Sequence, residues 1–139
     1  MAKKAYEDCI LFLLSKAFQK AHGKFKKRFQ AYGLTPMQGL VLTAVSEEEG
    51  LSAGEIGKML VLDQATLSGV LERLAEAGWI IKEIAEEDKR YLRIYLTPKA
   101  RELTGAIIRE RDEANEEIMS GLRIEERLLL KRMLTDLQR

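Results

Sequence analysis

The chain has 139 residues, 46% of them apolar, and a net charge of +1. This length corresponds to one domain. No apolar run is long enough to span a bilayer, and the N-terminus lacks the layout of a signal peptide. The near-neutral charge argues against tight non-specific binding of nucleic acid, but specific binding needs only a few well-placed cations. A single cysteine forms no internal disulfide, which fits the reducing cytoplasm. Because no run can span a bilayer, we expect no membrane partner.

The segment from Ala5 to about Ala31 is predicted to be one long helix. Its apolar residues recur mostly every four positions, which gives one buried stripe. A second group widens the stripe beyond what one neighbouring helix can cover, so we expect a partner subunit there. Gly33 is the predicted C-cap. The stripe consists of Tyr6, Ile10, Leu13, Ala17, Ala21, Phe25 and Phe29, and the second group of Leu11, Phe12, Leu14 and Phe18.

A start signal for the next helix follows at Thr35. Thr35 is a good N-cap, Pro36 suits the first helical position, and Gln38 completes a capping box. The sequence therefore predicts a helix that ends near residues 47–50. Its expected buried face is Met37, Leu40, Val41, Ala44 and Val45.

Two short helical patterns and a charged hairpin come next. Ser52 and Glu55 form a capping-box pattern, and Asp63 is a good N-cap for a second helix that Gly78 ends. Residues 79–84 and 90–96 are predicted strands, joined by residues 85–89. The apolar residues of the two helices are Ile56, Met59 and Leu60, then Leu67, Val70, Leu71 and Leu74; in the second strand they are Leu92, Ile94 and Leu96. This order predicts a helix-turn-helix with a wing over residues 34–97.

The C-terminal third is predicted to hold two further helices. Thr97-Pro98 repeats the earlier start signal, and Gly121 separates a helix ending near Ser120 from a last helix over about 124–137. The leucines of 128–137 exceed what one chain needs. The predicted fold is mainly α with a small β-hairpin wing. It is a single domain, 1–139, in which N- and C-terminal dimerisation helices, 1–33 and 98–139, flank the winged helix-turn-helix.

The helix over residues 64–77 is the candidate recognition helix. Its exposed side chains are small or carry polar groups, which suits a helix that enters the DNA major groove. Gln can bond an adenine edge, Ser and Thr can bond phosphate or base, and an Ala methyl can touch a thymine methyl. The alternative is a core helix whose outer face is polar. The candidate DNA-binding residues are Gln64, Ala65, Thr66, Ser68, Gly69 and Arg73.

The hairpin tip carries the other candidate DNA contacts, Asp88, Lys89 and Arg90. Arg90 can enter a narrow minor groove, where the potential is most negative. Asp88 can hold the guanidinium in a charge-assisted pair, and Lys89 is either a phosphate contact or solvated. The alternative is a surface ion pair that only stabilises the turn.

The sequence from about Leu34 to Arg101 resembles the MarR family of winged-helix transcription factors. The resemblance rests on the stretch from Gln64 to Ile80, on Asp88-Lys89-Arg90 and on residues 94–97. Lys82 stands where the family often has Arg, and Ala100 stands where it often has Gly. The resemblance implies a homodimeric repressor that binds a pseudo-palindromic operator in double-stranded DNA and is released by a small aromatic effector. The candidate effector-lining residues, which are equally good core residues, are Tyr6, Phe12, Phe18, Tyr32, Met37 and Met59.

Two other functions compete with this hypothesis. A winged helix without DNA activity could bind another protein through its near-neutral surface. A peroxide-sensing repressor could use Cys9, as one branch of the family uses a cysteine at a similar place. That branch pairs its cysteine with tyrosines, and the stretch after Thr35 has none. Because Ile10 and Phe12 are close by, we expect Cys9 to be a buried, inert thiol.

Catalytic and metal chemistry is not predicted. Cys9 and His22 are too far apart in the sequence, and too few, to bind a metal ion, and no nucleophile motif or glycine-rich phosphate loop is present. The sequence therefore predicts neither an enzyme nor a cofactor. The basic cluster from Lys24 to Arg28 is interpreted as a solvated face at a helix C-terminus, which the helix dipole favours.

Overall fold

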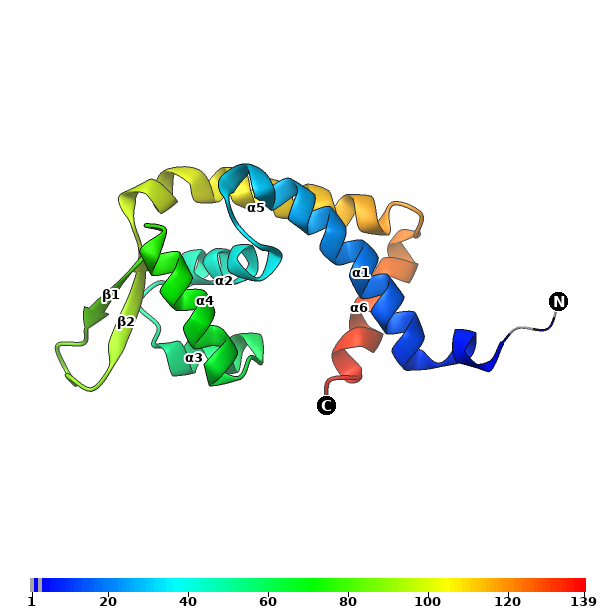
Figure 1. The fold of residues 1–139 in the computed structure, drawn as a ribbon, viewed down its shortest axis with the longest axis horizontal. Coiled ribbons are helices and arrows are strands. Elements are labelled where there is room, and N and C mark those ends of the chain that lie inside the picture. Colours follow the sequence, from blue (N-terminus) through cyan, green and yellow to red (C-terminus); the bar gives the residue numbers. More distant parts are fainter. Residues whose placement is uncertain (1, 3) are drawn as a thin grey trace.

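The computed structural model describes residues 2 and 4–139; the predicted dimerisation segment 1–33 also includes residues 1 and 3, which lie outside this description. Six α-helices, two short 3-10 helices and one hairpin make up the described chain (Figure 1). Within these residues no helix is long and apolar enough to cross a membrane. In chain order the elements are η1 (Ala5–Asp8), α1 (Ile10–Phe29), η2 (Gln30–Tyr32), α2 (Pro36–Glu47), α3 (Ala53–Leu60), α4 (Gln64–Glu76), β1 (Ile80–Ile84), β2 (Leu92–Leu96), α5 (Pro98–Met119) and α6 (Ile124–Asp136).

The first helix is shorter than predicted. The expected start at Ala5 is wrong, because Cys9 has extended backbone angles and separates the turn η1 from α1. Apolar periodicity cannot detect such a break, since Tyr6 and Ile10 keep the spacing of four across it. At the other end the prediction is confirmed, since Gly33 has a left-handed φ of 69° directly after η2.

The predicted N-caps are present at four helices. The side chains of Thr35, Ser52, Asp63 and Thr97 each accept a hydrogen bond from the backbone N–H three residues later. Thr35 also forms the reciprocal half of its capping box, because its N–H donates to Oε1 of Gln38 at 3.0 Å. These bonds satisfy backbone donors that a helix start leaves unpaired, which is why the helices begin where they do.

The core lies within the winged helix, where α2, α3, α4 and β2 meet the start of α5 and the end of α1. Leu67, Leu71 and Leu74 of α4 are buried, as predicted. The predicted buried face of α2 is only partly right: Val41, Ala44 and Val45 are buried, but Met37 and Leu40 are exposed. Helix α2 packs on both α4 and α5. Its buried face therefore includes Leu42 and does not include Met37 and Leu40, which lie in the first turns of the helix. The fully buried residues include Phe29, Leu42, Ile56, Leu67, Leu71, Leu74, Ile80, Ile94 and Ile107.

The wing is a two-stranded antiparallel hairpin in which Ile80 pairs with Leu96 and Ile84 with Leu92. Both strands are shorter than predicted, so the connecting loop covers residues 85–91. Ile94 and Leu96 are buried on the face that packs on the core. Leu92 is exposed because it lies at the end of the hairpin that projects beyond the core (Figure 1).

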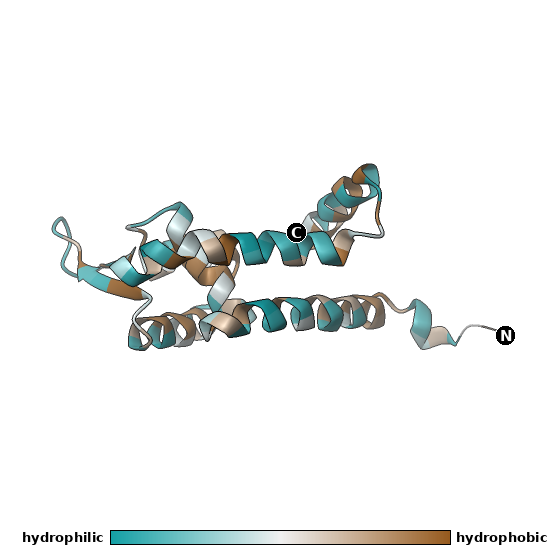
Figure 2. Ribbon diagram, turned by 90° about the horizontal axis from the view of Figure 1, so that it is seen from above, coloured by the Kyte–Doolittle hydropathy of each residue, from teal (hydrophilic) through white to brown (hydrophobic). Residues whose placement is uncertain are grey.

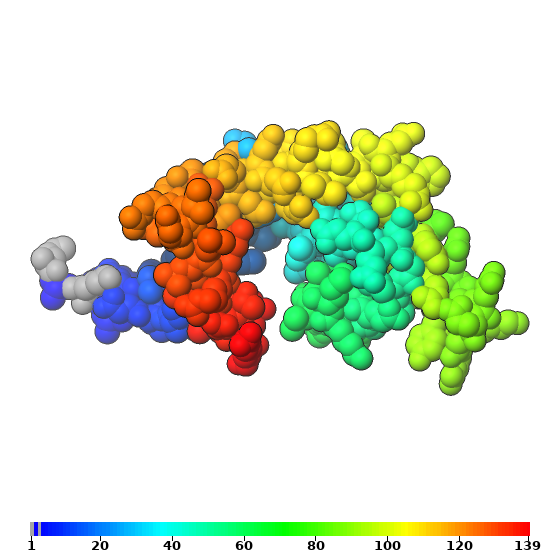
Figure 3. Space-filling model, turned by 180° about the vertical axis from the view of Figure 1, so that it is seen from behind, coloured from blue at the N-terminus to red at the C-terminus, as the bar shows by residue number. Residues whose placement is uncertain are grey.

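Helices α1 and α5 form a span between the winged helix and the two chain ends. They pack against each other and run alongside each other when seen from above (Figure 2), but the start of α1 diverges from α5 (Figure 1). Arg28 of α1 joins them, since it bonds Glu110 at 2.9 Å, Glu113 at 2.6 Å and also Glu117, all on α5. From behind, the winged helix and the lobe formed by α6 with the start of α1 are separated by an opening beneath this span (Figure 3).

The lobe at the chain ends exposes a large apolar surface. No described side chain of α6 is buried, and Phe29 is the only buried residue of α1. A monomeric protein rarely leaves so much apolar surface in water. The exposed apolar residues are Ile10, Leu11, Leu13, Leu14 and Phe18 on α1, and Ile124, Leu128, Leu129, Met133, Leu134 and, just after the helix, Leu137 at the C-terminus.

Candidate nucleic-acid interface

The exposed face of α4 carries every residue predicted for the recognition helix. These side chains all reach solvent, while the opposite face of the helix is buried in the core. The core thus fixes the rotation of α4, and a small polar surface faces outward. The exposed residues are Gln64, Ala65, Thr66, Ser68, Gly69 and Arg73.

Asp63 fixes the start of this helix and also engages Thr66. Its carboxylate accepts the Thr66 backbone N–H at 2.8 Å and the Thr66 hydroxyl at 2.7 Å. The backbone bond from Thr66, followed by the hydroxyl bond, lowers the pKa of Asp63 below its ordinary value. The Thr66 hydroxyl proton is therefore used within the cap, and only its lone pairs remain for a ligand.

The start of α4 also places Gln64 against α3. A Cβ atom built on Gly57 would lie only 2.5 Å from Nε2 of Gln64. Gly57 is itself buried. The absence of a side chain at this position therefore lets the Gln64 amide lie across α3 in the unbound protein.

A depression separates α4 from the wing. Its volume is about 510 Å³, and Gln64, Ala65 and Ser68 line one side of it. Lys82 of β1 and Leu92 of β2 line the other side. The structure therefore brings the first turns of α4 and the inner face of the hairpin to one surface. Lys82 was not among the predicted DNA contacts. Because it lies two residues from both Ile80 and Ile84, strand alternation could have placed it on the same face of the hairpin.

Arg90 at the wing tip is held by Asp88 in a two-point pair. Nε of Arg90 donates to Oδ1 of Asp88 at 3.1 Å, and Nη2 donates to Oδ2 at 2.9 Å. The Arg90 side chain is nevertheless 84% exposed. Its side-chain bonds, followed by the bond from its backbone N–H, lower the pKa of Asp88, so the pair is charged at neutral pH. The predicted Asp88–Arg90 pair is confirmed, while Lys89 is exposed beside it.

Glu49 connects the wing to the span, a role that the sequence did not indicate. Its carboxylate accepts the Leu96 backbone N–H at 2.7 Å and binds Arg101 of α5 at 2.6 and 2.9 Å. Partial burial alone would raise the pKa of Glu49, but these bonds outweigh burial and lower it. Residues that lie 47 and 52 positions apart in the sequence leave no local pattern to detect.

The candidate effector residues are spread over the chain. Tyr6 and Phe12 make an edge-to-face contact with ring centroids 5.2 Å apart, and Phe18 lies against His22. Tyr32 packs partly buried on the core. Met37 and Met59 are exposed on α2 and α3. The effector site therefore stays a prediction.

Cys9 is exposed, so the expectation of a buried thiol is wrong. The physical reason is the backbone break before α1, which leaves Cys9 as an N-cap instead of placing it on a packed helix face.

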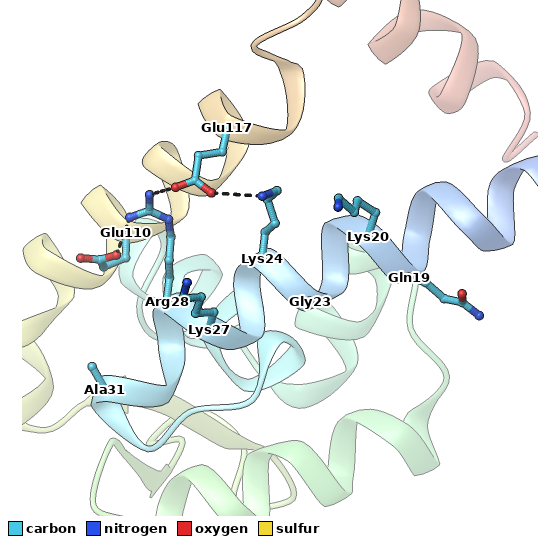
Figure 4. A pocket seen from close by; sticks show the side chains of 9 residues that line it. All are labelled: Gln19, Lys20, Gly23, Lys24, Lys27, Arg28, Ala31, Glu110 and Glu117. Carbon is cyan, nitrogen blue, oxygen red and sulfur yellow. Dashed lines mark hydrogen bonds and ion pairs between the residues drawn. The ribbon is translucent and has the colours of Figure 1, made fainter.

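The basic cluster at the end of α1 has protein partners. Figure 4 shows Arg28 between Glu110 and Glu117. Nζ of Lys24 lies 3.7 Å from Oε2 of Glu117. The bond to Glu110, followed by that to Glu117, raises the pKa of Arg28. Lys24 and Arg28 join α1 to α5. The prediction that residues 24–28 form a solvated face is therefore only partly right. The reason is that α5 presents a row of carboxylates to α1.

Comparison with known proteins identifies the family. The MarR family model matches residues 32–90, which include α2, α3, α4 and the wing up to Arg90. A crystal structure of a probable transcriptional regulator from Pseudomonas aeruginosa is 30% identical, with a TM-score of 0.89 over 95% of this chain and 98% of that one. The chain belongs to the MarR family of transcriptional regulators, a family without enzymatic activity.

Other relatives are also regulators. The HTH-type transcriptional regulator TtmR of Methylorubrum extorquens is 38% identical over 68% of this chain, but the match spans only 47% of TtmR. The organic hydroperoxide resistance transcriptional regulator of Bacillus subtilis is 30% identical over 76% of this chain and 68% of its own length. The structure of Bordetella bronchiseptica BpsR, described for regulation of its DNA binding by 6-hydroxynicotinic acid, is 25% identical with a TM-score of 0.89 over 99% and 98% of the two chains.

Proposed function

We propose that this protein is a repressor that binds a pseudo-palindromic operator as a homodimer, with α4 in the major groove and the wing in the adjacent minor groove. The observation that carries the proposal is the shared surface of α4 and the wing, on which exposed polar side chains stand beside a pre-oriented Arg90. An arginine that is already held in its bound orientation loses less entropy on binding. Because the proposed target is chromosomal DNA, we expect the protein in the cytoplasm.

Lys82 adds a cation to this surface. It lines the depression opposite Gln64 and Ser68, so it can meet a phosphate at the edge of the major groove. As a lysine it provides a point charge without the two-point geometry of arginine. We therefore expect Lys82 to add affinity without sequence preference.

The dimer in this proposal forms through residues 1–33 and 98–139, with the whole chain acting as one unit. The exposed apolar side chains of α1 and α6 support it, because burial of such surface drives association. A two-fold dimer presents two α4 helices, which matches the symmetry of an inverted repeat. Sedimentation should give a species of twice the 15.8 kDa chain mass at micromolar concentration; a compact monomer would contradict the dimer and the operator symmetry together.

Release by a small aromatic effector completes the proposal. BpsR, whose DNA binding is described as regulated by 6-hydroxynicotinic acid, supports an effector of this class. An effector lodged between the dimerisation and DNA-binding parts would change the spacing of the two α4 helices, so that they no longer fit successive major grooves. The candidate lining is the predicted set of Tyr6, Phe12, Phe18, Tyr32, Met37 and Met59.

The DNA flanking the coding sequence provides the direct test. A labelled inverted repeat from that region should bind with a stoichiometry of two chains per site. A scrambled duplex of equal length should bind far more weakly at the same salt concentration. Aromatic carboxylates and phenols, added to the preformed complex, should then release the DNA. Equal binding to both duplexes would contradict sequence-specific repression.

A thiol-based mechanism is the second candidate for release, favoured by the exposure of Cys9 and by the hydroperoxide-linked relative from Bacillus subtilis. The peroxide-sensing branch of the family pairs its cysteine with tyrosines, and no tyrosine follows Thr35 in the first turns of α2. We therefore expect organic hydroperoxide to leave the DNA complex intact. Release of DNA from the wild type but not from the Cys9→Ser variant would establish the thiol mechanism instead.

A further inference from the structure

One arginine of the second wing strand connects the wing tip to the base of the wing. Arg93 lies in β2, and its guanidinium reaches two other segments of the chain. Nη1 donates to the backbone carbonyl of Gly50 at 2.7 Å, and Nη2 bonds the Glu87 carboxylate. Gly50 precedes α3, and Glu87 belongs to the loop between the strands. The side chain therefore spans from the helix-turn-helix to the loop that carries Arg90.

The anchor at Gly50 is itself fixed to β2. The Gly50 N–H donates to the Ile94 carbonyl at 2.8 Å, and the Ile94 N–H donates to the Leu51 carbonyl at 3.0 Å. Ser52 forms an isolated bridge with Arg93. The backbone around Gly50 is thus hydrogen-bonded to β2, and these bonds hold in place the carbonyl that accepts from the Arg93 guanidinium.

The wing tip needs a cation at this place. Glu87 and Asp88 line a small depression of about 200 Å³ together with Glu55 of α3, and Arg93 is the only cation in that lining. Asp88 is paired with Arg90, so without Arg93 the Glu87 and Glu55 carboxylates would share this depression with no cation to compensate them, which disfavours the observed position of the loop. The Glu87 backbone N–H, followed by Arg93, lowers the pKa of Glu87. Glu87 is the main cause of the raised pKa of Arg93, with smaller contributions from Tyr95 and then Glu55.

We propose that Arg93 is a positioning residue for DNA binding, which holds loop 85–91 against the base of the wing so that Arg90 stands ready to enter the minor groove. The proposal rests on the function proposed above. Asp88 orients the Arg90 guanidinium within the loop, and Arg93 fixes the loop relative to α3 and α4. The Arg93 side chain is 36% exposed, against 84% for Arg90, and its Nη1 and Nη2 are bound to Gly50 and Glu87, so the proposal gives Arg93 no DNA contact of its own.

Loss of the two Arg93 bonds should therefore lower the affinity for operator DNA without removing a contact between a cation and a phosphate. A loop that is not held in place must be ordered when DNA binds, and this ordering weakens binding. Two wings per dimer carry the loss, so we expect Arg93→Met to weaken operator binding by about tenfold. The methionine keeps an apolar stem of similar length but loses both bonds. The salt dependence should stay that of the wild type, because no phosphate contact disappears.

Operator titrations by fluorescence anisotropy at several salt concentrations test this, with the wild type, Arg93→Met, Arg90→Ala and the double variant. In the Arg90→Ala background, Arg93→Met should cause no further loss. Arg109→Met serves as the matched control, since it removes the same charge from the exposed face of α5. In the free protein, the Tyr91 amide, which donates to the Asp88 carbonyl at 3.1 Å, should exchange its hydrogen faster in Arg93→Met.

Each other outcome has a defined meaning. A shallower salt slope for Arg93→Met would show that Arg93 contacts phosphate directly, and additive losses in the double variant would show that it does not act through Arg90. Wild-type binding together with unchanged Tyr91 exchange would show that the loop needs no such anchor. Each of these results overturns the proposal. Failure of the wild type to prefer the operator would instead overturn the proposed function.

Discussion

Val61 stores conformational strain at the turn between α3 and α4, and replacing it with glycine should stabilise the protein. It has φ 55° and ψ 49°, the left-handed region that a β-branched residue rarely adopts. The side chain is 76% exposed, so truncation removes little packing. The left-handed conformation costs an L-residue about 1–2 kcal/mol, whereas glycine adopts it freely.

The expected gain is smaller than the strain. Glycine also makes the unfolded chain more flexible, which offsets about 0.4–1 kcal/mol. Val61→Gly should therefore raise the free energy of unfolding by about 0.5–1 kcal/mol, which corresponds to roughly 2–4 °C in Tm for a chain of this size.

Thermal melts followed by circular dichroism at one fixed chain concentration provide the assay. Val61→Ala keeps a Cβ atom and most of the strain, so its Tm should change little. Lys58→Gly, at an exposed helical position of α3, should lower the Tm because glycine is a poor helix former. A Tm that falls as much for Val61→Gly as for Lys58→Gly would refute the strain argument.

Two further substitutions test the packing and the connection between wing and span. Gly39→Ala should lower the free energy of unfolding by about 1–3 kcal/mol, because the new Cβ would lie 2.3 Å from the buried Phe29 ring. Gly105→Ala is the control and should not lower the free energy of unfolding, since the nearest atom to its new Cβ lies at 3.7 Å. Glu49→Gln should lower stability at neutral pH by on the order of 1.5 kcal/mol. Since the pKa of Glu49 is lowered in the folded state from an ordinary value of 4.5, its contribution is present above that value and is lost as the pH falls through the folded pKa. The difference between wild type and Glu49→Gln should therefore shrink in urea titrations at progressively lower pH, and a difference that is constant from pH 7 to pH 3 would contradict the assignment.

The elements that the sequence predicted best are those specified by neighbouring residues. A cap such as Thr35 or Asp63 acts on a backbone donor three residues away, so its pattern is visible in a short window. The alternation of Ile94 and Leu96 likewise identified the buried face of the wing. The Asp88–Arg90 pair was predictable for the same reason, because its partners are two residues apart.

The features that the sequence did not reveal depend on backbone angles or on distant partners. The break at Cys9 keeps the apolar spacing of a continuous helix, and Val61 carries no residue signal for a left-handed turn. The partners of Glu49, and Gly50 as one of the two partners of Arg93, lie more than 40 positions away. They meet only because β2 returns beside the segment that precedes α3. Such contacts follow from topology, which a local pattern does not contain.

The central claim is that α4 and the wing read DNA together, and a salt-dependent titration of Arg90→Ala and Gln64→Ala against operator and scrambled duplex tests it most directly. Arg90→Ala removes two cation contacts per dimer, so affinity should fall strongly and the slope of log K against log salt should become shallower by about 1.8, from roughly 0.9 per contact. Gln64→Ala should reduce the preference for the operator and leave the slope nearly unchanged. An Arg90→Ala protein with wild-type affinity and slope would mean that the wing does not touch DNA, and a role in binding another protein through the near-neutral surface would then replace the one proposed.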